Sequence, residues 1–343
     1  MKKITLLLVM ILSTVSYSQT ALPNDITQFL SAVDDCLTTN PVDGLCTNSE
    51  YGAMPDWDVS NVTDMQQAFF NKEDFNADIS GWNVSNVSIM RAMFYGARSF
   101  NQNITGWNTA NVTAMDLMFY GALDFSQPIG DWDTSSVINM GNMFYDAESF
   151  NQDISGWDVS SVISMYGMFE EASSFNQPLN DWDTSSVSDM NAMFALAFDF
   201  NQPLNDWDTS SVTNMDSMFF RASTFNQDIS NWCVTNIASE PTQFSTDTPL
   251  SESNKPVWGT CPTASVDNQN QLDISIYPNP TSDIVYFDGN YSQLKVVVYD
   301  ILGKQVIKES ITNSVDISQL EKGVYILQLS DGTKLTTQRI IKN

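Results

Sequence analysis

Residues 157–181 read WDVSSVISMYGMFEEASSFNQPLND, and this unit decides the fold because it recurs along the chain. Eight tryptophans lie 25 residues apart without slippage, at Trp57, Trp82, Trp107, Trp132, Trp157, Trp182, Trp207 and Trp232. Phenylalanines keep the same step from Phe75 to Phe225. A strict period of this length is typical of repeat proteins, in which each unit buries its apolar face only against its neighbours.

Each repeat combines two patterns. Trp157 and Val159 point to one side and Asp158 to the other, which predicts a short strand. The apolar residues that follow recur at three- and four-residue steps, which predicts a short helix with one buried face. These residues are Val162, Met165, Met168, Phe169 and Ala172. Each repeat is therefore predicted to contain a strand, a turn, a short helix and a return loop.

The charge of the chain limits its partners. Its 343 residues include 14 Lys and Arg against 41 Asp and Glu, a net charge of -27. Such a field opposes binding to nucleic acid and to anionic membrane surfaces, and it favours cationic partners or metal ions.

The absence of histidine limits the chemistry. It rules out a Ser-His-Asp triad and removes the commonest general base. Paired carboxylates could still hydrolyse a glycoside, but acids at a periodic position differ from a unique pair in a pocket. We therefore expect no enzyme activity and no cofactor.

Composition divides the chain into six segments. Residues 1–18 carry two lysines, an apolar run and small residues before a cleavage point, which predicts a secretory signal peptide. No other apolar run is long enough for a membrane span. The remaining segments are a helical N-terminal cap (19–55), the repeats (56–233), a C-terminal cap (234–262), a polar linker (263–271) and a tail (272–343). Short β-branched runs in the tail predict a small all-β, immunoglobulin-like sandwich of antiparallel strands.

Four cysteines fit two disulfides in an exported chain. Cys36 and Cys46 precede the repeats, whereas Cys233 and Cys261 end and follow them. Stacking at about 4.8 Å per repeat separates the two ends by roughly 35 Å, but a disulfide needs Cα atoms within about 7 Å. We therefore expect the pairs Cys36–Cys46 and Cys233–Cys261, one staple at each end.

The succession of WDVSSV, MxxMF and FNQDISGW, from about Asp56 to Cys233, resembles the BspA-type leucine-rich repeats, first noted in mycoplasma lipoproteins. The resemblance implies an α/β repeat solenoid of leucine-rich-repeat type, with 25-residue coils and a parallel sheet along one side. It also implies a bacterial surface protein, as the members of this family are, and several of them are linked to adhesion to host proteins or other cells.

The tail resembles a second family. Its motifs are Tyr277-Pro278-Asn279-Pro280, Asp300-Ile301-Leu302-Gly303-Lys304, Leu320-Glu321-Lys322-Gly323-Val324-Tyr325 and Arg339-Ile340-Ile341-Lys342. They are similar to the type A sorting domain of the type IX secretion system. The resemblance implies that residues 272–343 engage this machinery. It also implies a protein secreted or displayed on the outer-membrane surface of a Gram-negative bacterium of the Bacteroidetes kind.

The tryptophan ladder has two interpretations. The indoles could form an exposed platform for sugars, or they could face the core together with the Val or Thr two residues later. We favour the core, because eight exposed indoles in a row would make a very large apolar patch.

The residue after each tryptophan is then expected on the outer face. These residues form an acidic strip of Asp58, Asn83, Asn108, Asp133, Asp158, Asp183 and Asp208. Stacked carboxylates repel one another, so one interpretation is a solvated face that keeps the protein soluble. The other is a binding face for a basic partner, or for Ca²⁺ at Asp133, Asp158, Asp183 and Asp208, because hard cations prefer oxygen ligands.

Together these observations predict a non-catalytic binding or adhesion scaffold for an extracellular protein or glycan, with the acidic strip as its candidate binding face. The alternative is a self-associating structural matrix or surface-layer component. A polysaccharide-active enzyme is the third and least favoured hypothesis.

Overall fold

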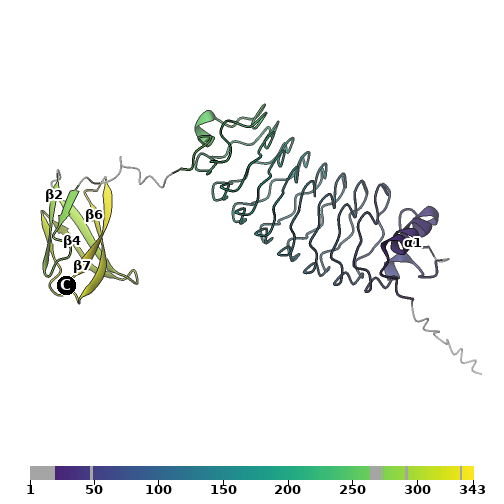
Figure 1. Cartoon of the computed structure of the whole chain (residues 1–343), viewed down its shortest axis with the longest axis horizontal. Coiled ribbons are helices and arrows are strands. Elements are labelled where there is room, and N and C mark those ends of the chain that lie inside the picture. The colour runs from purple at the N-terminus through teal and green to yellow at the C-terminus, as the bar shows by residue number, and fades with distance from the viewer. Residues whose placement is uncertain (1–19, 47–48, 263–271, 273, 290–292, 333) are drawn as a thin grey trace, which may run out of the picture. The chain divides into compact units, whose positions relative to one another are not determined.

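The computed structural model describes residues 20–46, 49–262, 272, 274–289, 293–332 and 334–343. The chain divides into two compact units, Met1–Pro262 with the repeats and Thr263–Asn343 with the tail (Figure 1). The expected signal peptide (1–18) and linker (263–271) lie outside the described residues.

The N-terminal cap is built on one helix, α1 (Ile26–Thr39). Asp25 accepts a hydrogen bond from a backbone N–H of the first turn, as a helix N-cap does. The buried Phe29 ring meets Trp82 edge-on, with ring centroids 6.4 Å apart. The disulfide Cys36–Cys46 joins the end of the helix to the following loop, with Cα atoms 5.1 Å apart. Figure 1 shows α1 covering the N-terminal end of the repeats.

The repeats consist of turns where helices were expected. Every residue between Trp57 and Trp232 is described, and none of them lies in a helix. The N–H groups of Met168, Glu170 and Ala172 each donate to the carbonyl three residues back. Positive φ angles at Gly167 (57°) and Glu171 (61°) would interrupt a helix in any case.

The intervening N–H groups link each repeat to the next. Those of Met165, Gly167, Phe169 and Glu171 donate to carbonyls 24 residues ahead, at 2.8–2.9 Å. Only single-residue parallel bridges result, such as Ser164 to Asp189. The expected α/β repeat solenoid with a parallel sheet is therefore wrong. Both sheets formed by the described residues lie in the tail and are antiparallel.

The physical cause of this difference is the spacing that consecutive turns produce. Turns closed by hydrogen bonds across three residues bring apolar side chains inward at nearly the period of a helix. The N–H groups that a helix would pair internally find their acceptors on the neighbouring repeat. Hydrophobic spacing within one repeat therefore could not distinguish the two structures.

The tryptophans lie in the core of this repeat stack, each at most 4% exposed. From Trp82 to Trp232, each indole N–H of the ladder donates to a carbonyl 28 residues earlier, as Trp157 does to Ile129 at 3.0 Å. Phenylalanine rings stack beside them; Phe144 and Phe169 are nearly parallel, with centroids 5.7 Å apart. The aromatic rings are thus buried between repeats, where they cannot serve as a platform for sugars.

The C-terminal cap ends the ladder by turning its rings. The ring of Phe244 makes an interplanar angle of 90° with Phe219 and of 81° with Trp258. The cap therefore offers no ring parallel to the ladder on which a further repeat could stack. The disulfide Cys233–Cys261 closes this cap, with Cα atoms 4.0 Å apart. Both expected disulfides are present.

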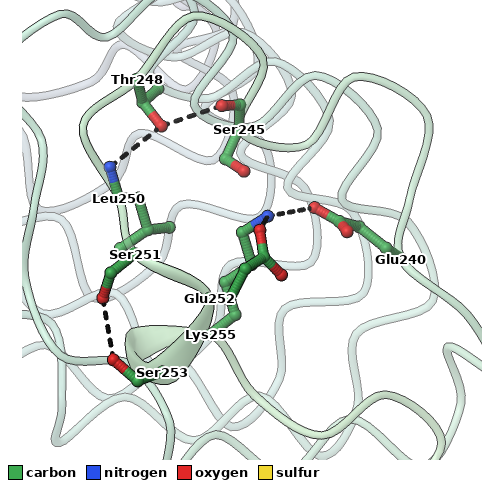
Figure 2. A network of polar contacts seen from close by, with 8 residues as sticks. All are labelled: Glu240, Ser245, Thr248, Leu250, Ser251, Glu252, Ser253 and Lys255. Carbon is green, nitrogen blue, oxygen red and sulfur yellow. Dashed lines mark hydrogen bonds and ion pairs between the residues drawn. The ribbon is translucent and has the colours of Figure 1, made fainter.

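Lys255 holds the same cap together (Figure 2). It follows the 3-10 turn Glu252–Asn254, and its ammonium lies 2.7 Å from a carboxylate oxygen of Glu240 and of Glu252. Burial lowers the pKa of Lys255, but the hydrogen bonds and charges of the two carboxylates outweigh burial, so its pKa is raised. The cap therefore keeps a charged lysine whose side chain is only 9% exposed.

The described residues of the tail form seven strands. They are β1 (Ile274–Tyr277), β2 (Ile284–Gly289), β3 (Leu294–Asp300), β4 (Gln305–Ile311), β5 (Ser314–Asp316), β6 (Gly323–Ser330) and β7 (Leu335–Lys342). One sheet has the order β1-β2-β5 and the other β4-β3-β6-β7. Val285 from the first sheet and Val296 and Leu327 from the second share one buried core. The tail agrees with the antiparallel strands expected from its sequence.

Candidate functional site

The acidic strip lies outside the core, and its carboxylates and amides close turns. Asp58 and the six residues at 25-residue steps from it are exposed or half-buried. In every one, Oδ1 accepts a hydrogen bond from the N–H two residues later. Asp158 also accepts the Ser160 hydroxyl at 2.6 Å. The strip therefore supplies the side-chain acceptor for the turn that opens each repeat.

In four carboxylates of the strip these hydrogen bonds favour the ionised form. The serine hydroxyl and then the serine N–H lower the pKa of Asp58, Asp133, Asp158 and Asp183. The charge of Asp158 works in the opposite direction on Asp133 and Asp183. Among the described residues, no three His, Cys, Asp or Glu side chains converge as a metal site requires. The hydrogen bond that closes each turn is enough to explain why Asp or Asn recurs at this position, and no bound ligand is needed to explain it.

A comparison of equivalent positions identifies a different surface, on the turn-rich side of each repeat. Positions 63, 66, 70, 71 and 73, with those at 25-residue steps from them through 223, change chemical class between repeats; we call them the variable face. One such column reads Phe70, Tyr95, Tyr120, Tyr145, Glu170, Ala195 and Phe220. The strip, in contrast, contains only Asp and Asn before Cys233.

The large apolar side chains exposed by the repeats all belong to the variable face. They are Phe70 (39% exposed), Ile138 (49%), Ile163 (51%), Tyr166 (42%) and Phe198 (43%). Ile138 and Ile163 are neighbours, because the N–H of Ile163 donates to the carbonyl of Ile138 at 2.9 Å. Single exposed apolar side chains are ordinary, whereas adjoining ones mark interaction surfaces.

Charge is distributed unevenly over this face. The basic residues of this face are Arg91, Arg98 and Arg221, toward its two ends. Arg91 pairs with Asp116 at 2.7 Å, and Arg221 pairs with Asp247 of the C-terminal cap at 3.4 Å. No Lys or Arg occurs between Trp107 and Asp206. The acids of the variable face in this interval are Asp116, Asp146, Glu148, Glu170 and Glu171. The centre of the face is therefore acidic.

A column of tyrosines leads into this centre. The rings of Tyr95 and Tyr120 lie 4.4 Å apart and those of Tyr120 and Tyr145 4.3 Å apart, nearly parallel. The Tyr145 hydroxyl donates to Glu171 Oε1 at 2.8 Å. Burial, this hydrogen bond and the Glu171 charge raise the pKa of Tyr145 well above its usual range. The column therefore presents hydroxyl groups rather than ring faces.

Glu170 continues the same column in the next repeat. A Cβ added to Gly167 would stand 3.2 Å from Glu170 Oε2, so the carboxylate occupies space that this glycine leaves open. Burial, and then the charge of Glu171, raise the pKa of Glu170 to about 7. Burial and the charges of Glu171 and Glu148 also raise the pKa of Asp146, against the opposing charge of Arg98. Glu170 thus changes charge near neutral pH.

Sequence reasoning selected the acidic strip and missed the variable face. Acids that recur drew attention to the strip, but they recur because every repeat needs the same turn. The informative signal was variation between repeats at equivalent outward positions, and not recurrence. Among the positions that point outward, those whose residue type changes from repeat to repeat mark the variable face.

The geometry defines a repeat protein with capped ends and one chemically varied side. The family described as "Mycoplasma protein of unknown function, DUF285" matches residues 44–157 and 148–258, and the chain belongs to this family. The family described as "Secretion system C-terminal sorting domain" matches residues 275–343. Among curated proteins, none matches the chain. The resemblance to mycoplasma surface repeats is confirmed at the level of the family, whereas its leucine-rich character stays a prediction.

The sorting domain indicates secretion through the type IX system. The protein is therefore secreted or displayed on the outer surface, consistent with Bacteroidetes, and its tail is the segment addressed to the secretion machinery. In the part of the chain that the structure describes, no helix combines the length and apolar character needed to cross a membrane.

Proposed function

We propose that the protein is an exported, non-catalytic scaffold that binds an extracellular ligand through the variable face. The observation that carries this proposal is that the large apolar side chains exposed by the repeats all lie on the variable face, whose charge also changes from repeat to repeat. In repeat proteins the recurring positions build the scaffold, and one exposed side serves recognition. A non-catalytic role also agrees with a sequence that lacks histidine.

Self-association into a matrix has less support. The helix α1 covers one end of the stack, and the perpendicular rings of Phe244 and Trp258 close the other. A second chain therefore finds no open repeat to continue. Two variable faces brought together would also place like charges opposite one another.

The test uses substitutions that the chain itself supplies. A patch variant carries Ile138→Thr, Ile163→Ser and Tyr166→Asn. Sister repeats hold these replacement residues at the same positions, as Thr113, Ser188 and Asn191. Each new side chain thus already fits the backbone of a repeat, and we expect the variant to fold normally.

A matched strip variant carries Asp158→Asn and Asp183→Asn, after Asn83 and Asn108 in the same column. Both variants and the wild type, as full-length protein, are applied to an array of extracellular proteins and glycans. We expect ligands that the patch variant loses and the strip variant keeps. The proposal fails if every captured ligand binds both variants as it binds the wild type, or depends on the strip alone.

A further inference from the structure

We infer that the centre of the variable face binds a basic polypeptide segment that also carries apolar side chains. This inference rests on the proposed function and names the class of partner. The centre has two parts: the central patch of Ile138, Ile163 and Tyr166, and the acidic group of Asp146, Glu148, Glu170 and Glu171.

The central patch spans two neighbouring repeats. Ile138 and Ile163 are joined by the backbone hydrogen bond between their repeats. Tyr166 lies beside Gly141 of the preceding repeat, where an added Cβ would be 4.0 Å from Tyr166 Cβ. The N–H of Asn142 donates to the Tyr166 carbonyl at 2.6 Å and holds its backbone in place. Gly141 therefore brings no side chain against Tyr166, which is 42% exposed.

The acidic group begins next to the patch. Gly167 directly follows Tyr166, and Glu170 Oε2 lies over this glycine. Glu171, the next residue, accepts the Tyr145 hydroxyl from the preceding repeat. The repeats that carry these carboxylates contain no Lys or Arg of their own. Carboxylates beside exposed apolar side chains form a surface whose complement is basic and apolar.

Other classes of ligand fit this surface less well. A platform for sugars would need several free aromatic faces, but neighbouring rings cover both faces of Tyr120 and the indoles are buried. Tyr166 is then a single exposed ring beside two isoleucines. A partner strand would need free backbone groups, yet the N–H groups of Met165, Gly167 and Phe169 already donate to the next repeat. Nucleic acid is opposed by the net charge of -27. Recognition through side chains by a basic, apolar segment remains.

The experiment measures binding of short fluorescein-labelled peptides to the full-length protein by fluorescence anisotropy at physiological ionic strength. The first peptide alternates Lys and Leu, the second Lys and Ser, and the third Glu and Leu. We expect the Lys–Leu peptide to bind most tightly. We also expect the patch variant to bind it about tenfold more weakly and the strip variant to bind it as the wild type does. Circular dichroism and thermal melting confirm that both variants fold.

Three results would overturn the inference. Equal affinity for Lys–Leu and Lys–Ser peptides would show that the patch contributes nothing. Equal weakening by the patch and strip variants would show attraction by the general negative field. Equal binding of the Glu–Leu peptide would remove the role of the acidic group. On the protein and glycan array, a ligand that depends on the patch but is a glycan or an acidic protein would overturn this inference and leave the proposed function standing. The absence of any patch-dependent ligand would overturn both.

Discussion

Replacement of Glu170 by glutamine should stabilise the repeat stack at about pH 8 but not at about pH 4.5. In the folded chain, burial and the charge of Glu171 raise the pKa of Glu170 from 4.5 to about 7. Below about pH 4.5 this carboxyl is protonated in both the folded and the unfolded chain, and above about pH 7 it is ionised in both. The stability of the folded chain therefore falls across this window as pH rises. Glutamine keeps the shape of the side chain and removes the ionisation.

The magnitude follows from the displacement of the pKa. At 1.36 kcal/mol per pH unit, a rise from 4.5 to about 7 corresponds to an upper bound of about 3.4 kcal/mol. The Glu170 side chain is half-buried, so water screens part of the cost of its charge. We therefore expect Glu170→Gln to raise the free energy of unfolding by about 1–2 kcal/mol at about pH 8.

The assay is urea denaturation followed by fluorescence of the buried tryptophans, at a series of pH values from about 4.5 to 8. Asp158→Asn is the matched control. Hydrogen bonds from Ser160 lower the pKa of Asp158 below its ordinary 3.8, so the stability it contributes is complete above that pH and is lost only at lower pH. Its difference from wild type should stay constant across the series. A pH-independent difference for Glu170→Gln as well would refute the reasoning.

Three further changes test the core and the C-terminal cap. Trp157→Phe removes the indole N–H from the Ile129 carbonyl, and we expect it to lower the free energy of unfolding by about 1–3 kcal/mol; an unchanged urea midpoint would contradict this. Lys255→Met removes the ammonium between two carboxylates and should cost about 1–2 kcal/mol, with faster amide hydrogen exchange confined to residues 234–262. Replacing Cys233 and Cys261 by serine opens a 28-residue loop and should cost about 2–4 kcal/mol, measured as a lower melting temperature than that of the wild type under non-reducing conditions.

Several features of the fold could be predicted from the sequence because residue type and spacing along the chain determine them. A tryptophan every 25 residues must lie inside, since an exposed row of indoles would be a very large apolar patch. Cysteines on opposite sides of a long stack cannot meet, which leaves Cys36 with Cys46 and Cys233 with Cys261. In the tail, short β-branched runs between turn residues form strands with little competition from other structures.

The structure of each repeat could not be predicted in the same way. Val162, Met165 and Met168 have the spacing of a helix face, but Gly167 and Glu171 adopt positive φ and half of the N–H groups donate to the next repeat. Turns and helices place apolar residues inward at similar intervals. Only the hydrogen bonds between repeats distinguish them, and these are absent from the local pattern.

The sequence by itself determined the repeat, the inward tryptophans, the two disulfides and the sorting tail, because each follows from residue type and spacing along the chain. The tertiary structure alone decided that the repeats are turns rather than helices. It also moved the candidate binding surface from the acidic strip to the variable face. Stacking brings residues 24 to 28 positions apart into contact, so it decides which N–H groups are paired, which carboxylates close turns and which side chains stay exposed. Asp158 is a turn acceptor and Tyr166 is an exposed ring for this reason.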